Sequence, residues 1–400
     1  MWVSRTFAEL GYTYTGLSGK KKADFGAGVP YVPYMNVFSN EKVDVDAFEY
    51  VHVGSGERQN VVAIGDALFT TSSETPQEVG MSSVLTEKTG NVYLNSFCFG
   101  FRFHKPSDFV PDFLAYALRS QQIRHQMFIA AQGSTRHNLS KENFGKMTLS
   151  YPASPDEQRR IAEILTTADE TIAASRALLE KYAAVKLGLL RDLLGAREWT
   201  NKTFAELGYT YTGLRGKKKG DFGAGMPYVP YMNVFSNEKV DVDAFEYVHI
   251  GNGERQNLVA VGDVLFTTSS ETPQEVGMSS VLTEKTGNVY LNSFCFGFRF
   301  HKPSDFVPDF LAYALRSQQI RHQMFIAAQG STRHNLSKEN FGKMTFSYPV
   351  SLAEQRRIAK ILTTADDRLK AEQKRLAKLE DIKRGLMDDL LTNKVSADKF

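Results

Sequence analysis

The chain has 400 residues, a net charge of +3, 42% hydrophobic residues and 23% charged residues. This length suits two or three folding units, and this composition is that of a globular protein and excludes a disordered or fibrous chain. The sequence has no apolar run of about 18 residues and no apolar segment behind a basic start, so it predicts neither a membrane span nor a signal peptide and favours a cytoplasmic location.

The chain is a tandem duplication. Aligned with itself at an offset of 197 residues, the sequence matches without a gap from Trp2 onwards. Residues 6–152 and 203–349 differ at only 9 of 147 positions, whereas 153–194 and 350–391 differ at 20 of 42. The first part of each copy has therefore stayed nearly equal, either because two equal copies are needed or because recombination homogenised them.

The first part of each copy predicts a mixed domain. Apolar residues alternate as in half-buried strands, and turn sequences such as VGSGERQN and EKTGN separate the segments. Residues 111–133 then follow helical spacing and end at Gly133, a suitable C-cap. This order predicts an α+β fold rather than a parallel βαβ array. The strands are expected at about 29–38, 43–53, 60–70, 79–85 and 91–103.

The second part of each copy predicts a long helix. Apolar residues recur at steps of 3 and 4 over residues 158–194, which indicates a coiled-coil seam of about five heptads. At 1.5 Å per residue, such a helix spans about 55 Å. Gly188 and Gly385 lie within these helices, where each costs about 1 kcal/mol relative to alanine. A close helix crossing would explain these glycines, and so would a tolerated defect. The seam residues are Ile161, Leu165, Ala168, Ile172, Ser175, Leu179, Tyr182, Lys186, Leu189 and Leu193, and in the second copy Ile358, Leu362, Ala365, Leu369, Glu372, Leu376, Leu379, Lys383, Leu386 and Leu390.

The short connection between the copies fixes how the two helices can pack. Only residues 195–202 join the first helix to the second globular domain, so the second helix can reach the first seam only by running back along it. We therefore expect an antiparallel coiled coil and a pseudo-two-fold relation between two equal domains. The expected parts are a first domain at 1–152, a helix and linker at 153–198, a second domain at 199–349, and a helix and tail at 350–400.

Each domain offers three polar segments that suit contacts with DNA, a target whose inverted half-sites are two-fold symmetric. The lysine run after Gly19 suits phosphates, although a solvated charge run explains it equally well. TTSSETPQE at 70–78 carries groups that read base edges, or is an ordinary surface turn. GSTRHNL can hold a phosphate, although Asn138 and Ser140 also suit caps of the helix SKENFG. The candidate DNA-binding residues are Lys20, Lys21, Lys22, Ser72, Ser73, Thr75, Gln77, Ser134, Thr135, Arg136 and His137, with the copies Lys217, Lys218, Lys219, Ser269, Ser270, Thr272, Gln274, Ser331, Thr332, Arg333 and His334.

The sequence does not favour a catalytic role. DFGAG is too short a glycine motif to indicate a methyltransferase, and the chain has no Pro-Pro dipeptide to build an adenine pocket. GLSGKKK lacks the spacing of a phosphate-binding loop, and the eight histidines show no metal-ligand spacing. We expect neither catalytic residues nor a metal site in this chain.

The sequence resembles the specificity subunits of type I restriction-modification systems. The run QGSTRHNLSKENFGKMTLSYPASPDEQRRIAEILTTAD, followed by a helix ending GLLRDLL, is similar to the junction of a target-recognition domain and a conserved helix in that family. The second copy ends in EQRRIAKILTTADDRLKAEQKRLAKLEDIKRGLMDDLLTNKV, which matches the pattern more closely. GVPYVPYMNVF and GDALFTTSS are similar to recurrent strand starts of the family. The resemblance covers essentially the whole chain.

The resemblance implies a non-catalytic subunit that binds a bipartite double-stranded DNA sequence. It implies two methyltransferase subunits as partners, which carry S-adenosylmethionine and methylate N6 of adenine, and a restriction subunit that uses ATP and Mg²⁺. No membrane is implied. Most members carry two different recognition domains. Because the two domains are nearly equal here, we expect an interrupted palindrome. In the loop before the lysine runs, Ser18 in the first copy stands against Arg215 in the second, and this is the one charge-changing difference that could break the symmetry.

Two other functions fit parts of the sequence. The domains are not basic overall, with 13 Lys and Arg against 14 Asp and Glu in 6–152 and 14 against 14 in 203–349. A symmetric scaffold that binds two proteins and no DNA fits this balance, and a stand-alone nuclease or methylase is a third hypothesis. If the chain binds DNA, this balance predicts weak binding alone and strong, salt-dependent binding with its partner.

Overall fold

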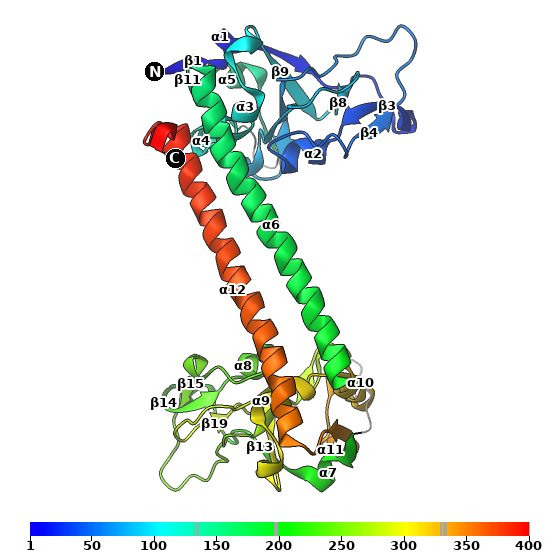
Figure 1. Ribbon diagram of the computed structural model, residues 1–400, viewed down its shortest axis with the longest axis vertical. Helices are drawn as coiled ribbons and strands as arrows, with labels where there is room; N and C mark the ends of the chain where they lie inside the picture. The colour runs from blue at the N-terminus through cyan, green and yellow to red at the C-terminus, as the bar shows by residue number, and fades with distance from the viewer. Residues whose placement is uncertain (132, 134–135, 196–198, 329, 331–333, 400) are drawn as a thin grey trace. The chain divides into compact units, whose positions relative to one another are not determined.

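The chain divides into two compact units, Met1–Arg176 with Lys374–Phe400, and Ala177–Gln373. Each unit holds one globular domain together with one half of each long helix. Figure 1 shows the computed structural model, which describes residues 1–131, 133, 136–195, 199–328, 330 and 334–399.

The globular domain of the first unit is built from short, mostly antiparallel sheets with helices packed on them. One sheet has four strands in the order β2-β9-β5-β7, and a second has the order β4-β3-β8, in which β3 and β8 are parallel. β1 pairs with β11, and β6 pairs with β10. This arrangement confirms the α+β class. The elements are β1 (Trp2–Thr6), α1 (Phe7–Leu10), β2 (Gly11–Thr15), η1 (Lys22–Asp24), β3 (Phe25–Val32), α2 (Tyr34–Ser39), β4 (Glu49–Val51), β5 (Ala67–Thr70), β6 (Ser72–Ser73), η2 (Pro76–Glu78), β7 (Ser82–Val84), β8 (Tyr93–Leu94), β9 (Cys98–Phe103), η3 (Pro106–Asp108), α3 (Pro111–Ala117), α4 (Gln121–Ala130), β10 (His137–Asn138), α5 (Lys141–Lys146) and β11 (Thr148–Pro152).

The globular domain of the second unit repeats this topology. Its four-stranded sheet has the order β13-β20-β16-β18, its three-stranded sheet has the order β15-β14-β19, and β12 pairs with β22 and β17 with β21. The elements are β12 (Thr200–Thr203), α7 (Phe204–Leu207), β13 (Gly208–Thr212), η4 (Lys219–Asp221), β14 (Phe222–Val229), α8 (Tyr231–Ser236), η5 (Val242–Ala244), β15 (Glu246–Val248), β16 (Val264–Thr267), β17 (Ser269–Ser270), η6 (Pro273–Glu275), β18 (Ser279–Val281), β19 (Tyr290–Leu291), β20 (Cys295–Phe300), η7 (Pro303–Asp305), α9 (Pro308–Ala314), α10 (Gln318–Ala327), β21 (His334–Asn335), α11 (Lys338–Lys343) and β22 (Thr345–Tyr348).

Every expected element of the first domain has other boundaries in the structure. The strand expected at 91–103 is two strands, β8 and β9, which belong to different sheets. The strands expected at 43–53, 60–70 and 79–85 are shorter, as β4, β5 and β7. The strand expected to run to residue 38 ends at Val32, and α2 begins just after Pro33. A short apolar run fits a strand and a helix equally well, so its periodicity could not decide between them. The helix expected over 111–133 is two helices, because Ser120 caps α4 by accepting a hydrogen bond from the Ile123 amide. Gly133 lies outside α4 and does not cap it.

Two long helices extend from the globular domains, α6 (Pro155–Leu194) and α12 (Leu352–Leu391), each of 40 residues. In the first unit, the end of α12 completes the core of the domain, where Leu390 and Leu391 are buried with Ile161 and Leu165 of α6. Ala397, near the end of the chain, is buried in the same core. Each core therefore depends on residues from both copies of the repeat.

In the second unit, the end of α6 takes the corresponding place. Leu194 is buried in that core with Ile358 and Leu362 of α12. The ion pair between Lys383 and Asp169 in the first unit recurs here as Lys186 with Asp366, with the roles of the two helices exchanged.

The two helices run antiparallel where they pack in the first unit. Arg176 of α6 pairs with Glu380 of α12, and Asp169 pairs with Lys383. Residue numbers therefore rise along one helix as they fall along the other, which confirms the predicted antiparallel packing.

The glycines within the long helices are predicted to be replaceable. A Cβ added at Gly188 or Gly385 meets no atom of the described residues within 4 Å, so neither glycine permits a close helix crossing. We expect Gly188→Ala and Gly385→Ala each to raise the free energy of unfolding by about 1 kcal/mol, the helix-propensity difference. Thermal unfolding measures this change. A lower melting temperature in either variant would show that the glycine is needed.

Candidate nucleic-acid interface

A short antiparallel ladder joins two of the three segments that the sequence singled out. In the first domain, Ser72 pairs with Asn138 and Ser73 pairs with His137. The carbonyl oxygen of Thr71 also accepts a hydrogen bond of 3.0 Å from the Leu139 amide. The ladder places the loop at residues 71–80, named the recognition loop here, beside the segment that carries Arg136.

The second domain has the same ladder. Ser269 pairs with Asn335 and Ser270 pairs with His334. Its recognition loop is residues 268–277. The candidates Ser134, Thr135, Ser331, Thr332 and Arg333 lie outside the described residues.

The hydroxyl groups of the first recognition loop divide into buried and exposed ones. Ser72 and Ser73 are 6% and 8% exposed. The Ser72 hydroxyl accepts a hydrogen bond of 3.2 Å from Nε of Arg136, and the Ser73 hydroxyl donates one of 3.2 Å to Glu78. Thr75 donates a hydrogen bond of 2.8 Å to the same Glu78 carboxylate but remains exposed. These bonds hold the loop in one shape from within.

Three predicted contact residues are therefore both near the ladder and open to solvent. Thr75 and Gln77 are exposed on the recognition loop, and Arg136 is exposed beside it. In the second domain, the equivalent Thr272 and Gln274 are exposed as well. Hydroxyl, amide and guanidinium groups supply the donors and acceptors that read base edges and hold phosphates.

The lysine run lies in a different part of the domain, before β3, and its three members differ. The Lys20 ammonium donates hydrogen bonds of 2.7 Å to the His52 carbonyl and 2.6 Å to Glu57, and its side chain is only 7% exposed. Hydrogen bonds from Lys20, Gln59 and the Gly54 amide lower the pKa of Glu57 to about 2. Lys20 thus links two loops of the domain.

The second copy repeats this division. Lys217 binds Glu254 at 2.6 Å and is 7% exposed. The remaining lysines of both runs are exposed, namely Lys21, Lys22, Lys218 and Lys219.

The two kinds of lysine are expected to respond differently to substitution. Replacing Lys21, Lys22, Lys218 and Lys219 with glutamine should lower the slope of log K against log salt by up to about 0.9 for each lost phosphate contact. Replacing Lys20 should leave that slope unchanged, since its charge is used within the domain. DNA titrations of the assembled complex at several salt concentrations measure both slopes. Equal slope changes would show that Lys20 also contacts phosphate.

An exposed aromatic residue next to the recognition loop was missed from the sequence. Phe97 is 58% exposed, and its equivalent Phe294 is 56% exposed. The Thr71 amide and hydroxyl both donate to the Phe97 carbonyl, at 3.0 and 2.7 Å, and the Phe97 amide donates to Asn95 at 2.8 Å. A rigid turn therefore presents this ring, and the sequence NSF that encodes it gave no periodic signal.

The interface is the same in both copies. Residues 68–148 are identical to 265–345, and these segments contain both recognition loops, both ladders and both exposed phenylalanines. The nine differences between the domains all lie outside these segments. Arg215, which replaces Ser18, donates a hydrogen bond of 2.6 Å to the Thr212 hydroxyl and lies before the lysine run.

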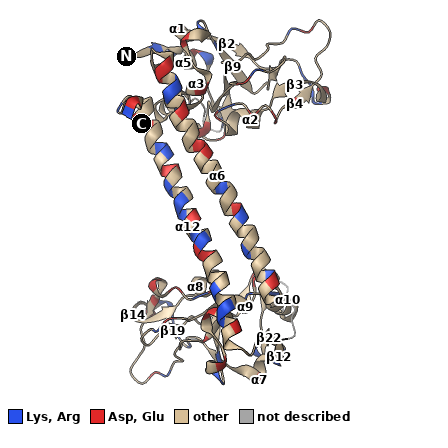
Figure 2. Ribbon diagram, viewed as in Figure 1, with Lys and Arg blue, Asp and Glu red and all other residues tan. Residues whose placement is uncertain are grey.

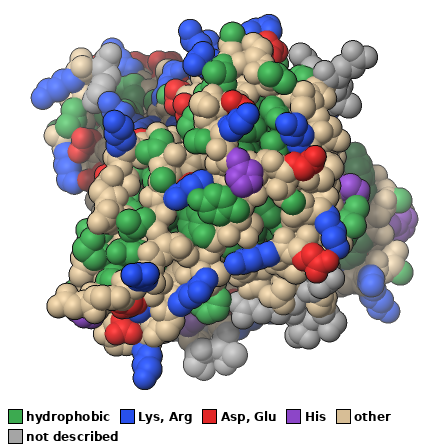
Figure 3. All heavy atoms as spheres, turned by 90° about the horizontal axis from the view of Figure 1, so that it is seen from below, with side chains coloured by type: hydrophobic (Ala, Val, Ile, Leu, Met, Phe, Trp, Pro, Cys, Tyr) green, Lys and Arg blue, Asp and Glu red, His purple; other side chains and the backbone are tan. Residues whose placement is uncertain are grey.

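Charges of both signs are mixed along the long helices and on one face of the molecule. Acidic and basic residues are interspersed along both long helices (Figure 2). On the face that Figure 3 presents, basic side chains are dispersed among hydrophobic and acidic ones rather than gathered in one patch. Such a surface supplies limited phosphate neutralisation by itself.

The chain belongs to the family described as Type I restriction modification DNA specificity domain, which matches residues 21–181 and 197–381. The two matches together cover most of the chain, one in each copy of the repeat. The specificity subunit is a non-catalytic component of restriction-modification systems. Among the described residues, no group of three or more His, Cys, Asp and Glu is placed to hold a metal ion.

Solved structures of such subunits share the fold. The S subunit of the type I restriction-modification system of M. genitalium is 16% identical, with a TM-score of 0.54, and the match covers 98% of this chain and 96% of that one. The HsdS subunit of Thermoanaerobacter tengcongensis is 16% identical, with a TM-score of 0.55 and coverage of 98% and 97%.

A third similar structure comes from work on complex assembly and conformational transition of the type I restriction-modification system. It is 15% identical, with a TM-score of 0.60 and coverage of 98% and 97%. Among the described residues of the present chain, no helix has the length and apolar character that crossing a membrane requires.

Proposed function

We propose that this specificity subunit binds an interrupted palindrome in double-stranded DNA and positions two adenine-N6 methyltransferase subunits on it. The observation that carries the proposal is the identity of the two interfaces. Each recognition loop has the same residues in the same local structure, so each selects the same bases. Two identical recognition loops fit a target that has two identical half-sites.

The packing of the long helices supports inverted rather than direct half-sites. The Lys383–Asp169 pair of the first unit recurs in the second as Lys186–Asp366, with α6 and α12 exchanged. Two copies in which the helices exchange roles fit half-sites that are inverted repeats on opposite strands.

The mixed surface charge supports a role for partners in holding the DNA. The exposed residues of the recognition loop suit base contacts, whereas most phosphate neutralisation must come from elsewhere. Methyltransferase subunits that close around the duplex would supply it, and would also bind S-adenosylmethionine. A restriction subunit that uses ATP and Mg²⁺ completes the proposed assembly.

Binding experiments with and without the methyltransferase test this proposal. A gel shift with the chain alone should show weak binding, and the co-purified complex should bind its target tightly and lose affinity steeply with salt. Random-sequence DNA is the control. Equal affinity with and without the partner would contradict the proposal that the methyltransferases supply most of the phosphate contacts. Failure of the complex to bind any DNA would favour the symmetric protein-binding scaffold.

A further inference from the structure

Arg124 contacts the recognition loop from α4, although no sequence pattern singled it out. Its Nη1 donates a hydrogen bond of 2.8 Å to the Gly80 carbonyl. Its Nη2 donates to the carbonyls of Gln77 at 2.6 Å and Val79 at 2.8 Å. One guanidinium group therefore holds three main-chain oxygens at the end of the loop.

The second copy repeats this arrangement. Arg321 donates to the carbonyls of Gly277, Gln274 and Val276 at 2.8, 2.6 and 2.7 Å. The same three positions of the loop are held in both domains, so the arrangement belongs to the interface and not to one copy.

The chemistry of these bonds indicates a demand on loop geometry. A guanidinium group carries five donors in one rigid plane, and lysine offers three donors on a flexible stem. Burial lowers the pKa of Arg124 to about 10, because the charge is removed from water. Among the described residues, the hydrogen-bond acceptors of Arg124 are all main-chain carbonyls. Without this guanidinium the three carbonyls would lose its hydrogen bonds, so the loop would no longer be held at these positions.

Both ends of the recognition loop are anchored. Gly80 has a φ of +65°, and a Cβ there would lie 2.6 Å from the sulfur of the buried Met127 on α4. At the other end, Thr71 is held by its bonds to the Phe97 carbonyl. The exposed Thr75 lies between these anchors. Gln77 is exposed too, and Arg124 binds its main-chain carbonyl.

We propose that Arg124 and Arg321 are positioning residues for sequence specificity. They do not contact DNA. They hold the recognition loops so that Thr75 and Gln77, and their copies Thr272 and Gln274, meet base pairs in one fixed geometry. This inference rests on the proposed function, and it assigns part of the specificity to residues behind the interface.

Methylation of matched oligonucleotides by the complex tests this inference. The target of the wild-type complex is mapped first, and the absence of site-specific methylation at this step contradicts the proposed function itself. The substrates are then the target, the target with one altered base pair in one half, and the target altered in both halves. The readout is the ratio of rates on altered and unaltered DNA, which does not depend on the fraction of folded protein.

The duplication makes the expected result specific. Arg124→Gln should raise the ratio about tenfold or more for DNA altered in one half, the scale of one lost base contact, and leave DNA altered in both halves a poor substrate. Arg321→Gln should do the same, and only the double variant should methylate DNA altered in both halves. Unchanged ratios in the folded double variant overturn the inference.

Arg119 provides the matched control. It lies between α3 and α4 and also donates to main-chain carbonyls, namely those of Ser82, Val37, Phe38 and Asn40, which are outside the recognition loop. Arg119→Gln should lower stability and leave the ratio unchanged. An equal rise in the ratio for this variant would show a merely structural effect. If Arg124→Gln does not fold, Arg124→Lys replaces it, with a smaller rise expected.

Discussion

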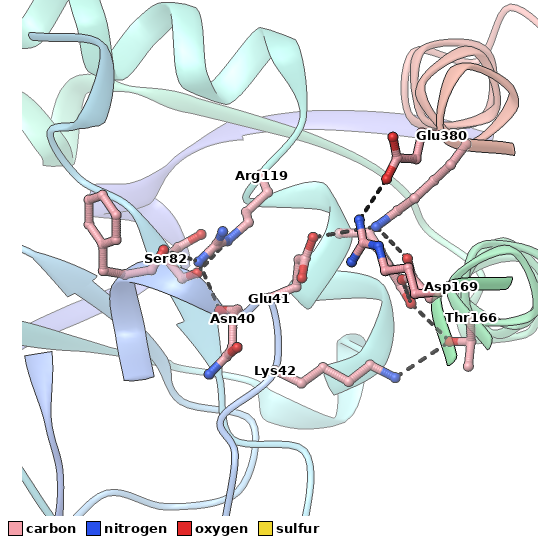
Figure 4. A network of polar contacts seen from close by, with 12 residues as sticks. Asn40, Glu41, Lys42, Ser82, Arg119, Thr166, Asp169 and Glu380 are labelled. Carbon is pink, nitrogen blue, oxygen red and sulfur yellow. Dashed lines mark hydrogen bonds and ion pairs between the residues drawn. The ribbon is translucent and has the colours of Figure 1, made fainter. Parts of the chain in front are cut away.

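Replacing Lys383 with methionine is expected to release the end of α12 from the first unit. Lys383 binds Asp169 at 2.5 Å and Glu41 at 3.4 Å, and its side chain is only 17% exposed. Figure 4 shows these carboxylates, with Glu41 from the globular domain and Asp169 from α6, and nearby Glu380 of α12. Glu380 binds Arg176 at 2.7 Å. One ammonium group thus joins three segments of the chain.

The expected loss follows from what the substitution leaves behind. Without Lys383, two carboxylates that are about one-third exposed face each other, and Tyr116 still donates to Asp169 at 2.8 Å. We expect a cost of about 2–3 kcal/mol, below that of a fully buried pair, and roughly 30- to 150-fold faster amide exchange. Hydrogen exchange over 374–391 measures it.

The same helix provides the control for this measurement. Lys378 is exposed, and Lys378→Met should leave exchange unchanged. Lys186→Met should instead speed amide exchange at the end of α6 in the second unit, where Lys186 binds Asp366. Normal protection of the α12 end in Lys383→Met would show that the ion pair does not hold the helix in place.

Acid should weaken the contact between Lys383 and Glu41. Burial raises the pKa of Glu41, but the charge of Lys383 and hydrogen bonds outweigh it, so the pKa lies below the ordinary value of a glutamate. Because the folded pKa is depressed, the stabilisation is complete above the unfolded pKa and is lost as the pH falls through the folded one. Protection of the α12 end should therefore fall as the pH drops below the ordinary pKa of a glutamate, and it should fall less in Lys383→Met.

Replacing the exposed Arg136, or its sequence copy Arg333, is expected to reduce methylation equally. Arg136→Ala should slow methylation of the target about tenfold or more, since a base or phosphate contact by arginine contributes about 1–3 kcal/mol. Arg333→Ala, its copy, should give the same factor. The double variant should give about the product of the two, because distant sites contribute independently.

The equality of the two single variants is the informative result. It follows from identical interfaces that act on identical half-sites. Lys88→Ala removes an equal charge from the exposed turn between β7 and β8 and should change the rate less than twofold. Losses that differ several-fold between Arg136→Ala and Arg333→Ala would show that the two halves of the target are not equivalent.

The long helices and the duplication could be predicted from the sequence because both are long, regular signals. A repeat at a fixed offset is visible without a structure, and ten seam positions at steps of 3 and 4 define a helix and the face it packs. The short α2 could not be predicted in this way. Over its six residues, from Tyr34 to Ser39, the alternating and helical patterns are too brief to be told apart.

The candidate site could be predicted only in part, for a different reason. The sequence indicates which residues are polar but not which partners they meet. Ser72 was expected to face DNA, yet in the fold its hydroxyl accepts a hydrogen bond from Arg136, 64 residues away. Lys20 meets Glu57, and Arg124 meets the carbonyls of a loop 44 to 47 residues away. Such pairings depend on the tertiary structure and leave no periodic trace in the sequence.

Sequencing of methylated adenines in DNA from cells that express this chain with its methyltransferase tests the central claim most directly. We predict one motif with two inverted halves of the same sequence, a constant spacer, and a modified adenine on opposite strands in the two halves. Halves of unrelated sequence, or the same half repeated in one direction, would contradict this account.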